Sequence, residues 1–159
     1  MTNEEIKIKI EQLAAEGLIN VLPFGDDWAG AEWLNVSIES KDWLPLAQQL
    51  RNNPDLDFDF LFCVTAVDWK TYYSVVYHLR SLKNEHVLVV KAKCDKANPE
   101  IESVAKIWRT AEFHEREAYD LMGIKFLYHP DLRRLFLTDD WVGYPLRKDY
   151  VDEVNIIKL

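Results

Sequence analysis

The sequence predicts a two-layer α+β domain, in which a mixed and largely antiparallel sheet carries helices on one face, followed by an extended C-terminal arm. Three runs rich in β-branched and aromatic residues follow one another with short links between residues 58 and 93, which favours antiparallel strands. The order of the expected elements also lacks the regular alternation of a doubly wound sheet. We therefore divide the chain into a core domain, residues 1–128, and a docking arm, residues 129–159.

The N-terminal helix is predicted by its cap and its apolar stripe. Thr2 and Glu5 have the spacing of a capping box, and Gly17 can end the helix. Apolar residues recur at helical spacing, at Ile6, Ile10 and Leu13.

A strand and a second helix are expected next. The run WLNVSI, residues 33–38, alternates apolar and other side chains as a half-buried strand does. Pro45 is tolerated in the following helix because it falls in the first turn. The apolar stripe of that helix consists of Trp43, Leu46, Ala47 and Leu50.

The three central strands are expected at residues 58–67, 72–79 and 86–93. The last two are joined by RSLKNE, residues 80–85, which is a plausible hairpin loop. After them, Asn98, Pro99 and Glu100 form a helix start. We expect this third helix to run to Gly123, with a break near Thr110, and to bury the stripe Ile101, Val104, Ala105 and Trp108.

The pattern changes after IKFLY, residues 124–128, which we interpret as a closing strand. The arm contains Pro130 and Pro145, no helical stripe and a short apolar end, VNIIKL. A structureless stretch of about 30 residues in a compact domain is usually functional. Because the arm is rich in Arg, Tyr and Trp, which supply most interface hot spots, we expect it to lie across a partner or back over its own domain.

Charge and composition exclude several classes of partner. With 19 Lys and Arg against 27 Asp and Glu, the net charge of -8 disfavours nucleic acid. No apolar run approaches the roughly 18 residues of a membrane span, so we expect no direct span. Cys63 and Cys94 lack metal-ligand spacing, which indicates two buried free thiols in a reducing compartment.

The run of charged residues from His114 resembles an active site but lacks a complete catalytic set. His114 and Glu115 begin like the H-E-x-x-H zinc motif, but Ala118 replaces the second His. Glu115 and Glu117 point to different sides of a helix, because they are two residues apart. A hydrolase that uses Glu115 or Glu117 with His129 remains an alternative, although a lone His here is more often structural.

Ion pairs offer a second interpretation of the same charges. Arg116 lies four residues before Asp120, so the two can pair along the helix. If these groups are partly buried, Arg133 and Arg134 become cross-partners that set geometry more than they add stability.

Several ordered motifs resemble one known family. They are Glu115-Arg116-Glu117, Tyr119-Asp120-Leu121-Met122-Gly123-Ile124, His129-Pro130-Asp131-Leu132-Arg133-Arg134 and Tyr144-Pro145-Leu146-Arg147-Lys148-Asp149-Tyr150. This set, together with VTAVDW, VVYHLRSL and IWRTAEFHERE upstream, is similar to the 30 kDa subunit family of NADH-quinone oxidoreductase, which is respiratory complex I. The resemblance covers about residues 58–150.

The resemblance implies a non-catalytic subunit of the quinone module, in the peripheral arm of a proton-translocating complex. It implies no cofactor on this chain, with FMN, iron–sulfur clusters and quinone on other subunits. The expected partners are the large quinone-module subunit and the subunit with the terminal iron–sulfur cluster, on the cytoplasmic side of the bacterial inner membrane. An equivalent subunit of a membrane-bound hydrogenase or a ferredoxin-dependent relative is the alternative.

The resemblance also suggests where partners bind and where this chain differs. Tyr128 stands where the family frequently has Gly, and we expect it to reroute a tight backbone path. Phe113, Met122 and Tyr144 stand where Trp, Phe and His are usual. The residues expected at a partner interface are Glu115, Arg116, Glu117, Asp120, His129, Asp131, Arg133, Arg134, Trp141, Tyr144, Arg147, Lys148, Asp149 and Tyr150.

Overall fold

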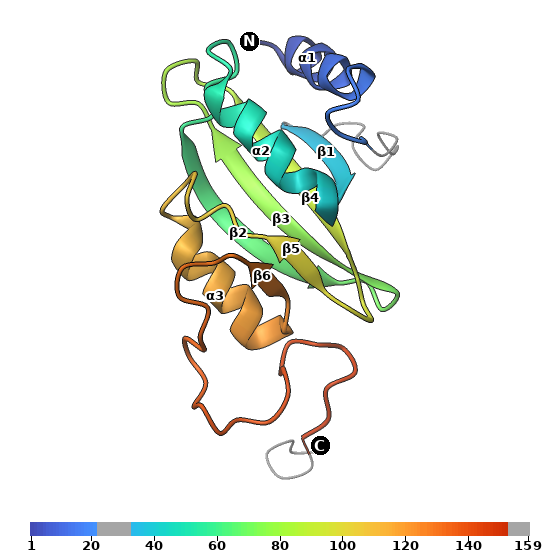
Figure 1. The fold of residues 1–159 in the computed structure, drawn as a ribbon, viewed down its shortest axis with the longest axis vertical. Helices are drawn as coiled ribbons and strands as arrows, with labels where there is room; N and C mark the ends of the chain where they lie inside the picture. The colour runs from blue at the N-terminus through green and yellow to red at the C-terminus, as the bar shows by residue number, and fades with distance from the viewer. Residues whose placement is uncertain (22–32, 153–159) are drawn as a thin grey trace.

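The computed structural model describes residues 1–21 and 33–152. The elements in chain order are α1 (Asn3–Ala15), β1 (Leu34–Glu39), the 3₁₀ helix η2 (Ser40–Asp42), α2 (Trp43–Asn52), β2 (Phe60–Asp68), β3 (Tyr72–Arg80), β4 (Val87–Asp95), β5 (Glu100–Glu102), α3 (Ala111–Met122) and β6 (Lys125–Leu127). Figure 1 shows the chain from α1 at one end of the molecule to the arm at the other.

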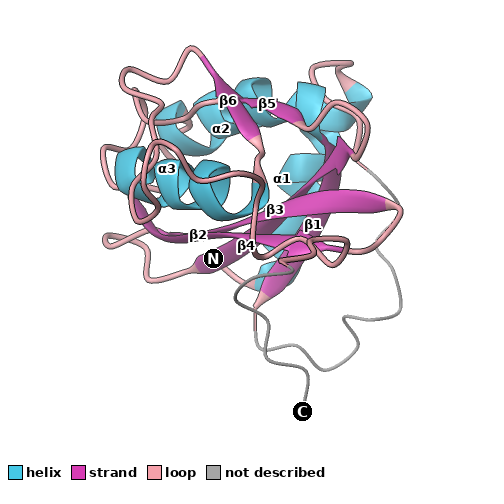
Figure 2. Ribbon diagram, turned by 90° about the horizontal axis from the view of Figure 1, so that it is seen from below, coloured by secondary structure: helices cyan, strands magenta, loops and turns pink. Residues whose placement is uncertain are grey.

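The main sheet has four strands in the order β1-β4-β3-β2. β1 runs parallel to β4, whereas β2, β3 and β4 form an antiparallel meander. Helices α2 and α3 lie on the same side of this sheet (Figure 2). The predicted fold class, a two-layer α+β domain with a mixed and largely antiparallel sheet, is confirmed.

Local sequence signals produce the first two helices. The Thr2 side chain accepts a hydrogen bond from the Glu5 N–H, and the Glu5 carboxylate accepts one from the Thr2 N–H, which completes the predicted capping box. In α2, Trp43 stacks on Tyr77 of β3 with 4.1 Å between ring centroids. The predicted apolar stripes of both helices are buried in one core.

The predicted loop between β3 and β4 closes a hairpin. The Ser81 N–H donates to the carbonyl of His86 at 3.0 Å, and the Glu85 N–H donates to the carbonyl of Ser81 at 2.9 Å. Of the two cysteines, Cys94 is buried as expected, and burial raises the pKa of its thiol to about 12. Cys63 is only partly buried.

The helix predicted from Asn98 to Thr110 is wrong. Residues 100–102 instead form β5, which pairs in parallel with β6 and sets Ile101 opposite Phe126. The helix begins only at Ala111. The strand forms because β6, more than twenty residues later in the sequence, supplies hydrogen-bond partners that no local pattern reveals.

The apolar stripe behind that prediction is nevertheless buried. Ile101, Val104, Ala105 and Trp108 all lie in the core. Trp108 reaches it from a turn, where its indole Nε1–H donates to the carbonyl of Phe58 at 2.9 Å. Apolar residues at helical spacing are therefore buried here by a strand and a turn instead of a helix.

Tyr128 keeps a left-handed backbone, with φ of +61°, and its side chain is 76% exposed. The expectation that it reroutes the chain is wrong, because the backbone adopts the conformation that favours Gly. Beyond it, residues 129–152 contain no helix or strand and loop past α3 (Figure 1). The predicted apolar end VNIIKL lies outside the described residues, and the boundary at residue 129 stays a prediction.

Candidate functional site

The candidate interface residues gather where the arm meets α3. This helix begins after Thr110, whose hydroxyl donates to the carbonyl of Leu61 at 2.7 Å, and it ends at Gly123. Gly123 has a φ of +71°, and a Cβ there would lie 2.6 Å from Cε2 of Tyr144 and also against the guanidinium of Arg147. The glycine therefore both ends the helix and lets the arm approach it.

Asp120 is the carboxylate that fixes the arm. Its Oδ2 accepts hydrogen bonds from three successive backbone N–H groups, those of Leu135, Phe136 and Leu137, at 3.0, 2.7 and 3.0 Å. Its Oδ1 accepts from Nη1 of Arg134 at 2.9 Å. Burial raises the pKa of Asp120, but these donors outweigh burial and lower it from its ordinary value.

Arg134 connects three parts of the arm and helix. Besides the Asp120 side chain, it donates to the Asp120 carbonyl at 3.0 Å and to the carbonyls of Trp141 and Gly143 at 3.1 and 3.2 Å. Its guanidinium lies 5.3 Å from the centre of the Tyr144 ring. A single, mostly buried guanidinium thus holds an irregular segment through backbone carbonyls.

Arg116 is buried beside the start of the arm. It donates to the carbonyls of Arg133 and Arg134 at 3.2 and 3.0 Å, and its Nη1 lies 3.9 Å from the Asp131 carboxylate. The predicted pairing of Arg116 with Asp120 is therefore wrong. The arm packs on α3, and its Arg134 forms the ion pair with Asp120 instead. The prediction that Arg134 is a cross-partner of a buried carboxylate is confirmed.

Glu115 is fully buried on the face of α3 that carries Ala111 and Ala118. Its carboxylate accepts hydrogen bonds from the hydroxyl of Ser103 and from the Val104 N–H at 2.9 Å. Burial raises the pKa of Glu115 to about 7, although both hydrogen bonds oppose the shift. Glu117 is exposed, so the prediction that these two glutamates point to different sides is confirmed.

His129 packs against the same carboxylate. Its Nδ1 accepts the Asp131 N–H at 3.0 Å, so its proton sits on Nε2, which donates to the carbonyl of Glu112 at 3.0 Å. Nε2 lies 3.9 Å from Oε2 of Glu115, and neither side chain is exposed. Because substrate in solvent does not reach this pair, the geometry does not support the hydrolase alternative.

Arg147 fixes the far end of the arm to α3 and β3. It donates to the carbonyl of Met122 at 2.7 Å. Its guanidinium lies 4.4 Å from the centre of the Tyr144 ring and 5.3 Å from that of Tyr73. These contacts satisfy a carbonyl that the helix end leaves unpaired.

Asp68, at the end of β2, holds the residue after Arg147. Its carboxylate accepts the Lys148 N–H at 3.0 Å, and Lys96 lies 3.4 Å from it and 3.5 Å from the Asp149 carboxylate. Burial raises the pKa of Asp68, but the N–H groups of Lys148 and Lys70 and the Lys96 ammonium together lower it. The motif VTAVDW contains Asp68 but did not reveal this role, because 80 residues separate Asp68 from Lys148.

The structure therefore brings most of the candidates together and leaves some apart. Arg133 is exposed and pairs with Asp131 at 2.9 Å, and the ring of Tyr150 lies against Gly143. Residues that sequence reasoning missed are Asp68, Tyr73, Lys96, Ser103 and Gly143. That any candidate also contacts a partner stays a prediction.

The described residues contain no group of three or more His, Cys, Asp or Glu side chains that could hold a metal ion. Within the same residues, every helix is too short or too polar to cross a membrane.

Comparison with known proteins decides the family. Residues 36–154 match the model of the respiratory-chain NADH dehydrogenase 30 kDa subunit. The chain belongs to this family. The resemblance inferred from the motifs is thus confirmed, and it extends beyond the residues 58–150 that carried it.

Two relatives illustrate how the 30 kDa subunit family varies in length. The NADH-quinone oxidoreductase C subunit of Chloroherpeton thalassium is 48% identical over 122 residues, which are 74% of this chain and 51% of the relative. The C/D subunit of Phocaeicola vulgatus is 50% identical over 103 residues, 64% of this chain and 20% of that protein. The chain thus spans about half of the first relative and a fifth of the second.

Solved structures share the fold. A trypsin-resistant fragment of Nqo5 is 27% identical, with a TM-score of 0.62, over 80% of this chain and 98% of the fragment. A chain of the membrane-bound sulfane sulfur reductase, an archaeal respiratory membrane complex, is 21% identical, with a TM-score of 0.65, over 95% of this chain and 87% of that one. At this identity the second similarity concerns the fold alone.

Proposed function

We propose that the chain is a non-catalytic quinone-module subunit of a proton-translocating NADH:quinone oxidoreductase. It holds the large quinone-module subunit in place and contacts the subunit with the terminal iron–sulfur cluster. FMN, iron–sulfur clusters and quinone bind to other subunits, and the chain lies peripherally on the cytoplasmic side of the bacterial inner membrane. Membership of the 30 kDa subunit family supports this proposal.

One observation carries the docking role: a buried ion pair holds the arm on α3 from within, while the arm exposes several apolar side chains. Asp120 is fully buried and the Arg134 side chain is 16% exposed, because both hold the arm on α3. By contrast, four apolar side chains of the arm are mostly exposed, Phe136 by 64%, Val142 by 86%, Leu146 by 59% and Val151 by 73%. Exposed apolar side chains that form a contiguous patch mark interaction sites, and we infer that these four contribute to one.

The name of one relative supports the choice of partner. The name of the Phocaeicola protein gives it as a combined C/D subunit, and this chain aligns with only a fifth of it. Two subunits that share one polypeptide remain at high effective concentration, which favours a direct contact between them. We therefore infer that the outward side of the arm contacts a D-type subunit, the large subunit of the quinone module.

The test is co-purification of substituted chains with the native complex. Leu146→Asp and Val142→Asp place a charge in the proposed contact, so we expect at least a tenfold loss of the large subunit from the purified chain, on the order of a hot-spot substitution. Leu82→Asp is the matched control, because Leu82 is also 59% exposed but lies in the β3–β4 loop. Equal recovery for all three variants would contradict the docking role of the arm.

The same preparation tests the non-catalytic role and the alternative assembly. We expect the purified chain alone to lack visible absorbance, and a stoichiometric iron–sulfur spectrum would contradict the proposal. Mass spectrometry of the native complex identifies the other subunits. Hydrogenase subunits in place of NADH-oxidising ones would instead assign the chain to the alternative, a membrane-bound hydrogenase or a ferredoxin-dependent relative.

A further inference from the structure

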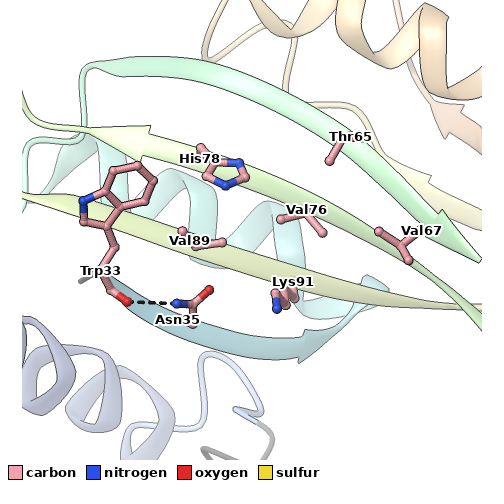
Figure 3. Close-up of a pocket in the computed structure, with 8 residues that line it drawn as sticks. All are labelled: Trp33, Asn35, Thr65, Val67, Val76, His78, Val89 and Lys91. Atoms are coloured by element: carbon pink, nitrogen blue, oxygen red, sulfur yellow. Dashed lines mark hydrogen bonds between the residues drawn. The ribbon is translucent and has the colours of Figure 1, made fainter. Parts of the chain in front are cut away.

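The outer edge of β2 is an open edge of the main sheet. β2 stands last in the strand order β1-β4-β3-β2, and in the described part of the chain only β3 pairs with it. Figure 3 shows Thr65 and Val67 on this strand, where their side chains lie on the open face of the sheet. Because successive side chains of a strand alternate between faces, those of Val64 and Ala66 point to the α3 side.

The backbone of this edge leaves hydrogen-bonding groups unpaired. The β2–β3 hairpin closes where the Trp69 N–H donates to the Tyr72 carbonyl at 2.9 Å, so every second residue of β2 from Trp69 bonds to β3. Thr65 is one of them, whereas the N–H and C=O groups of Val64 and Ala66 point outward. None of the residues described bonds to these outward groups. An edge strand with unpaired groups is a template for a further strand.

A small groove lies between this edge and α3. Besides the edge itself, it is lined by Ala118, Leu121 and Met122 of the helix and by Leu146 of the arm. Its volume of about 30 Å³ admits one short side chain. The groove therefore offers an apolar contact directly beside the unpaired backbone groups.

Contacts with other segments mark both ends of the open edge. At one end, the Thr110 hydroxyl donates to the Leu61 carbonyl at 2.7 Å. At the other end, the arm passes from Leu146 to Lys148, whose N–H donates to the Asp68 carboxylate at 3.0 Å. The stretch of β2 between these two contacts has the length of an ordinary short strand.

Glu117 supplies the charge of the groove. Its side chain is exposed and belongs to the groove lining. Burial and, after it, the Glu117 charge raise the pKa of the Cys63 thiol, which places this carboxylate near β2. Among the residues described, no Lys, Arg or His pairs with Glu117. The groove therefore favours a basic side chain on a segment that occupies it.

We propose that an extended segment of the large quinone-module subunit adds to the open edge of β2 as a further strand. Its backbone pairs with Val64 and Ala66, one short apolar side chain enters the groove, and a basic side chain meets Glu117. Leu146 lines the groove and also belongs to the proposed contact of the arm, so the two surfaces are continuous and take the same partner. This inference rests on the proposed function, from which it takes the partner.

A second copy of this chain fits the edge less well. Two β2 edges that pair about a twofold axis bring both Glu117 carboxylates to the same seam. Neither copy then offers the other a cation for this charge.

Hydrogen exchange of single amides tests the added strand. The Val64 and Ala66 N–H groups should exchange at least about tenfold more slowly in the native complex than in the free chain, because a new strand pairs with them. The Thr65 N–H, which bonds to β3, is the internal control and should be protected in both states. Equal exchange of Val64 and Ala66 in the two states would overturn the proposal.

Photo-cross-linking in the native complex identifies the occupant. Thr65 is exposed and lies between Val64 and Ala66, so a photoreactive amino acid in its place samples the neighbouring segment. We expect cross-links to one peptide of the large quinone-module subunit that contains Lys or Arg. Cross-links to another subunit, to this chain or to a second copy of it would overturn the proposal.

A proline at the edge tests the backbone contact. Ala66→Pro removes an outward N–H, and an edge strand tolerates proline where the N–H faces away from the sheet. It should lower retention of the chain on the complex about tenfold in a wash at moderate salt. Ala66→Ser is the control, since it keeps the N–H and a small side chain and should be retained like the wild type.

A charge reversal at an exposed position tests the groove without a change in the strand. Glu117→Lys should also lower retention about tenfold, because it sets like charges together. Glu11→Lys, the same change at an exposed position of α1, is the control and should have no effect.

The outcome separates this proposal from the proposed function. Absence of the wild-type chain from the native complex would contradict the proposed function. Normal assembly of the wild-type chain, together with unchanged retention of Ala66→Pro and Glu117→Lys, would contradict only the added strand.

Discussion

The carboxylate of Asp120 on α3 lies 2.9 Å from Nη1 of Arg134 in the arm, and the same carboxylate receives the three backbone N–H groups that follow Arg134. One buried side chain thus orders four consecutive residues that have no regular secondary structure. The arm is held by its own domain before any partner is considered.

Removal of the Asp120 charge should release the arm. Asp120→Asn keeps the size of the side chain but replaces one of the two accepting carboxylate oxygens by an amide N–H₂, which cannot accept a hydrogen bond. It also removes the negative charge that pairs with Arg134. We expect the free energy of unfolding to fall by about 2–4 kcal/mol. Hydrogen exchange should also lose protection at residues 135–137. Urea denaturation and exchange measured by mass spectrometry check both effects.

The control for Asp120→Asn is Asp139→Asn, a change of the same kind at an exposed carboxylate of the arm. It should change stability by less than about 0.5 kcal/mol. Unchanged protection of residues 135–137 in Asp120→Asn would show that contacts other than this carboxylate order the arm.

Glu115 should make stability depend on pH near neutrality. Its pKa is raised to about 7 in the folded chain from an ordinary 4.5, so its contribution to stability is complete below pH 4.5 and is lost as the pH rises through 7. Between pH 5 and pH 8, Glu115 should change the free energy of unfolding of the wild type by about 1–3 kcal/mol. Glu115→Gln should lack this change, because Gln does not titrate.

The measurement for Glu115 is the urea midpoint of wild type and Glu115→Gln at each pH. Wild type should be destabilised at pH 8 relative to the variant, whose own pH dependence comes from the remaining carboxylates. Parallel pH profiles for the two proteins would mean that Glu115 does not titrate in this range.

Gly123→Ala should be more costly than an ordinary glycine substitution. Its positive φ strains any residue with a Cβ, and the added methyl group also collides with Tyr144 and Arg147. We expect a loss of about 3 kcal/mol or more in thermal or urea unfolding. Gly17→Ala separates the two effects, because Gly17 has a φ of +74° but nothing within 4 Å of the new Cβ.

Gly17→Ala should accordingly cost only about 1 kcal/mol, which is the strain of the left-handed backbone alone. Equal losses for the two variants would contradict the close approach of the arm to the end of α3.

Tyr128→Gly should stabilise the chain, since Tyr128 is mostly exposed and holds a left-handed backbone. Relief of that strain, less the greater freedom of Gly in the unfolded chain, should give about 0.5–1 kcal/mol, or roughly 2–4 °C in Tm. Tyr128→Ala keeps the Cβ and should give no gain. A gain of equal size for Ala would place the effect in the Tyr side chain instead of the backbone.

The sequence by itself determined the elements that depend on neighbouring residues. The capping box at Thr2, the alternating strands and the hairpin loop at residues 80–85 all follow from local hydrogen bonds and from the period of the apolar residues. The family was also recognisable from the sequence, because its motifs are short runs of residues in a fixed order. These features do not require knowledge of distant parts of the chain.

Only the tertiary structure decided where the arm lies and what its charges do. Asp68 and Lys148 are 80 residues apart, and Ile101 forms a strand because Phe126 pairs with it. Likewise, Asp120 forms its ion pair with Arg134 and not with Arg116, which is nearer in the sequence, because the arm covers this part of α3. Burial and hydrogen bonds between distant segments outweigh local propensities of a few tenths of a kcal/mol per residue. These contacts therefore cannot be predicted from a local sequence pattern.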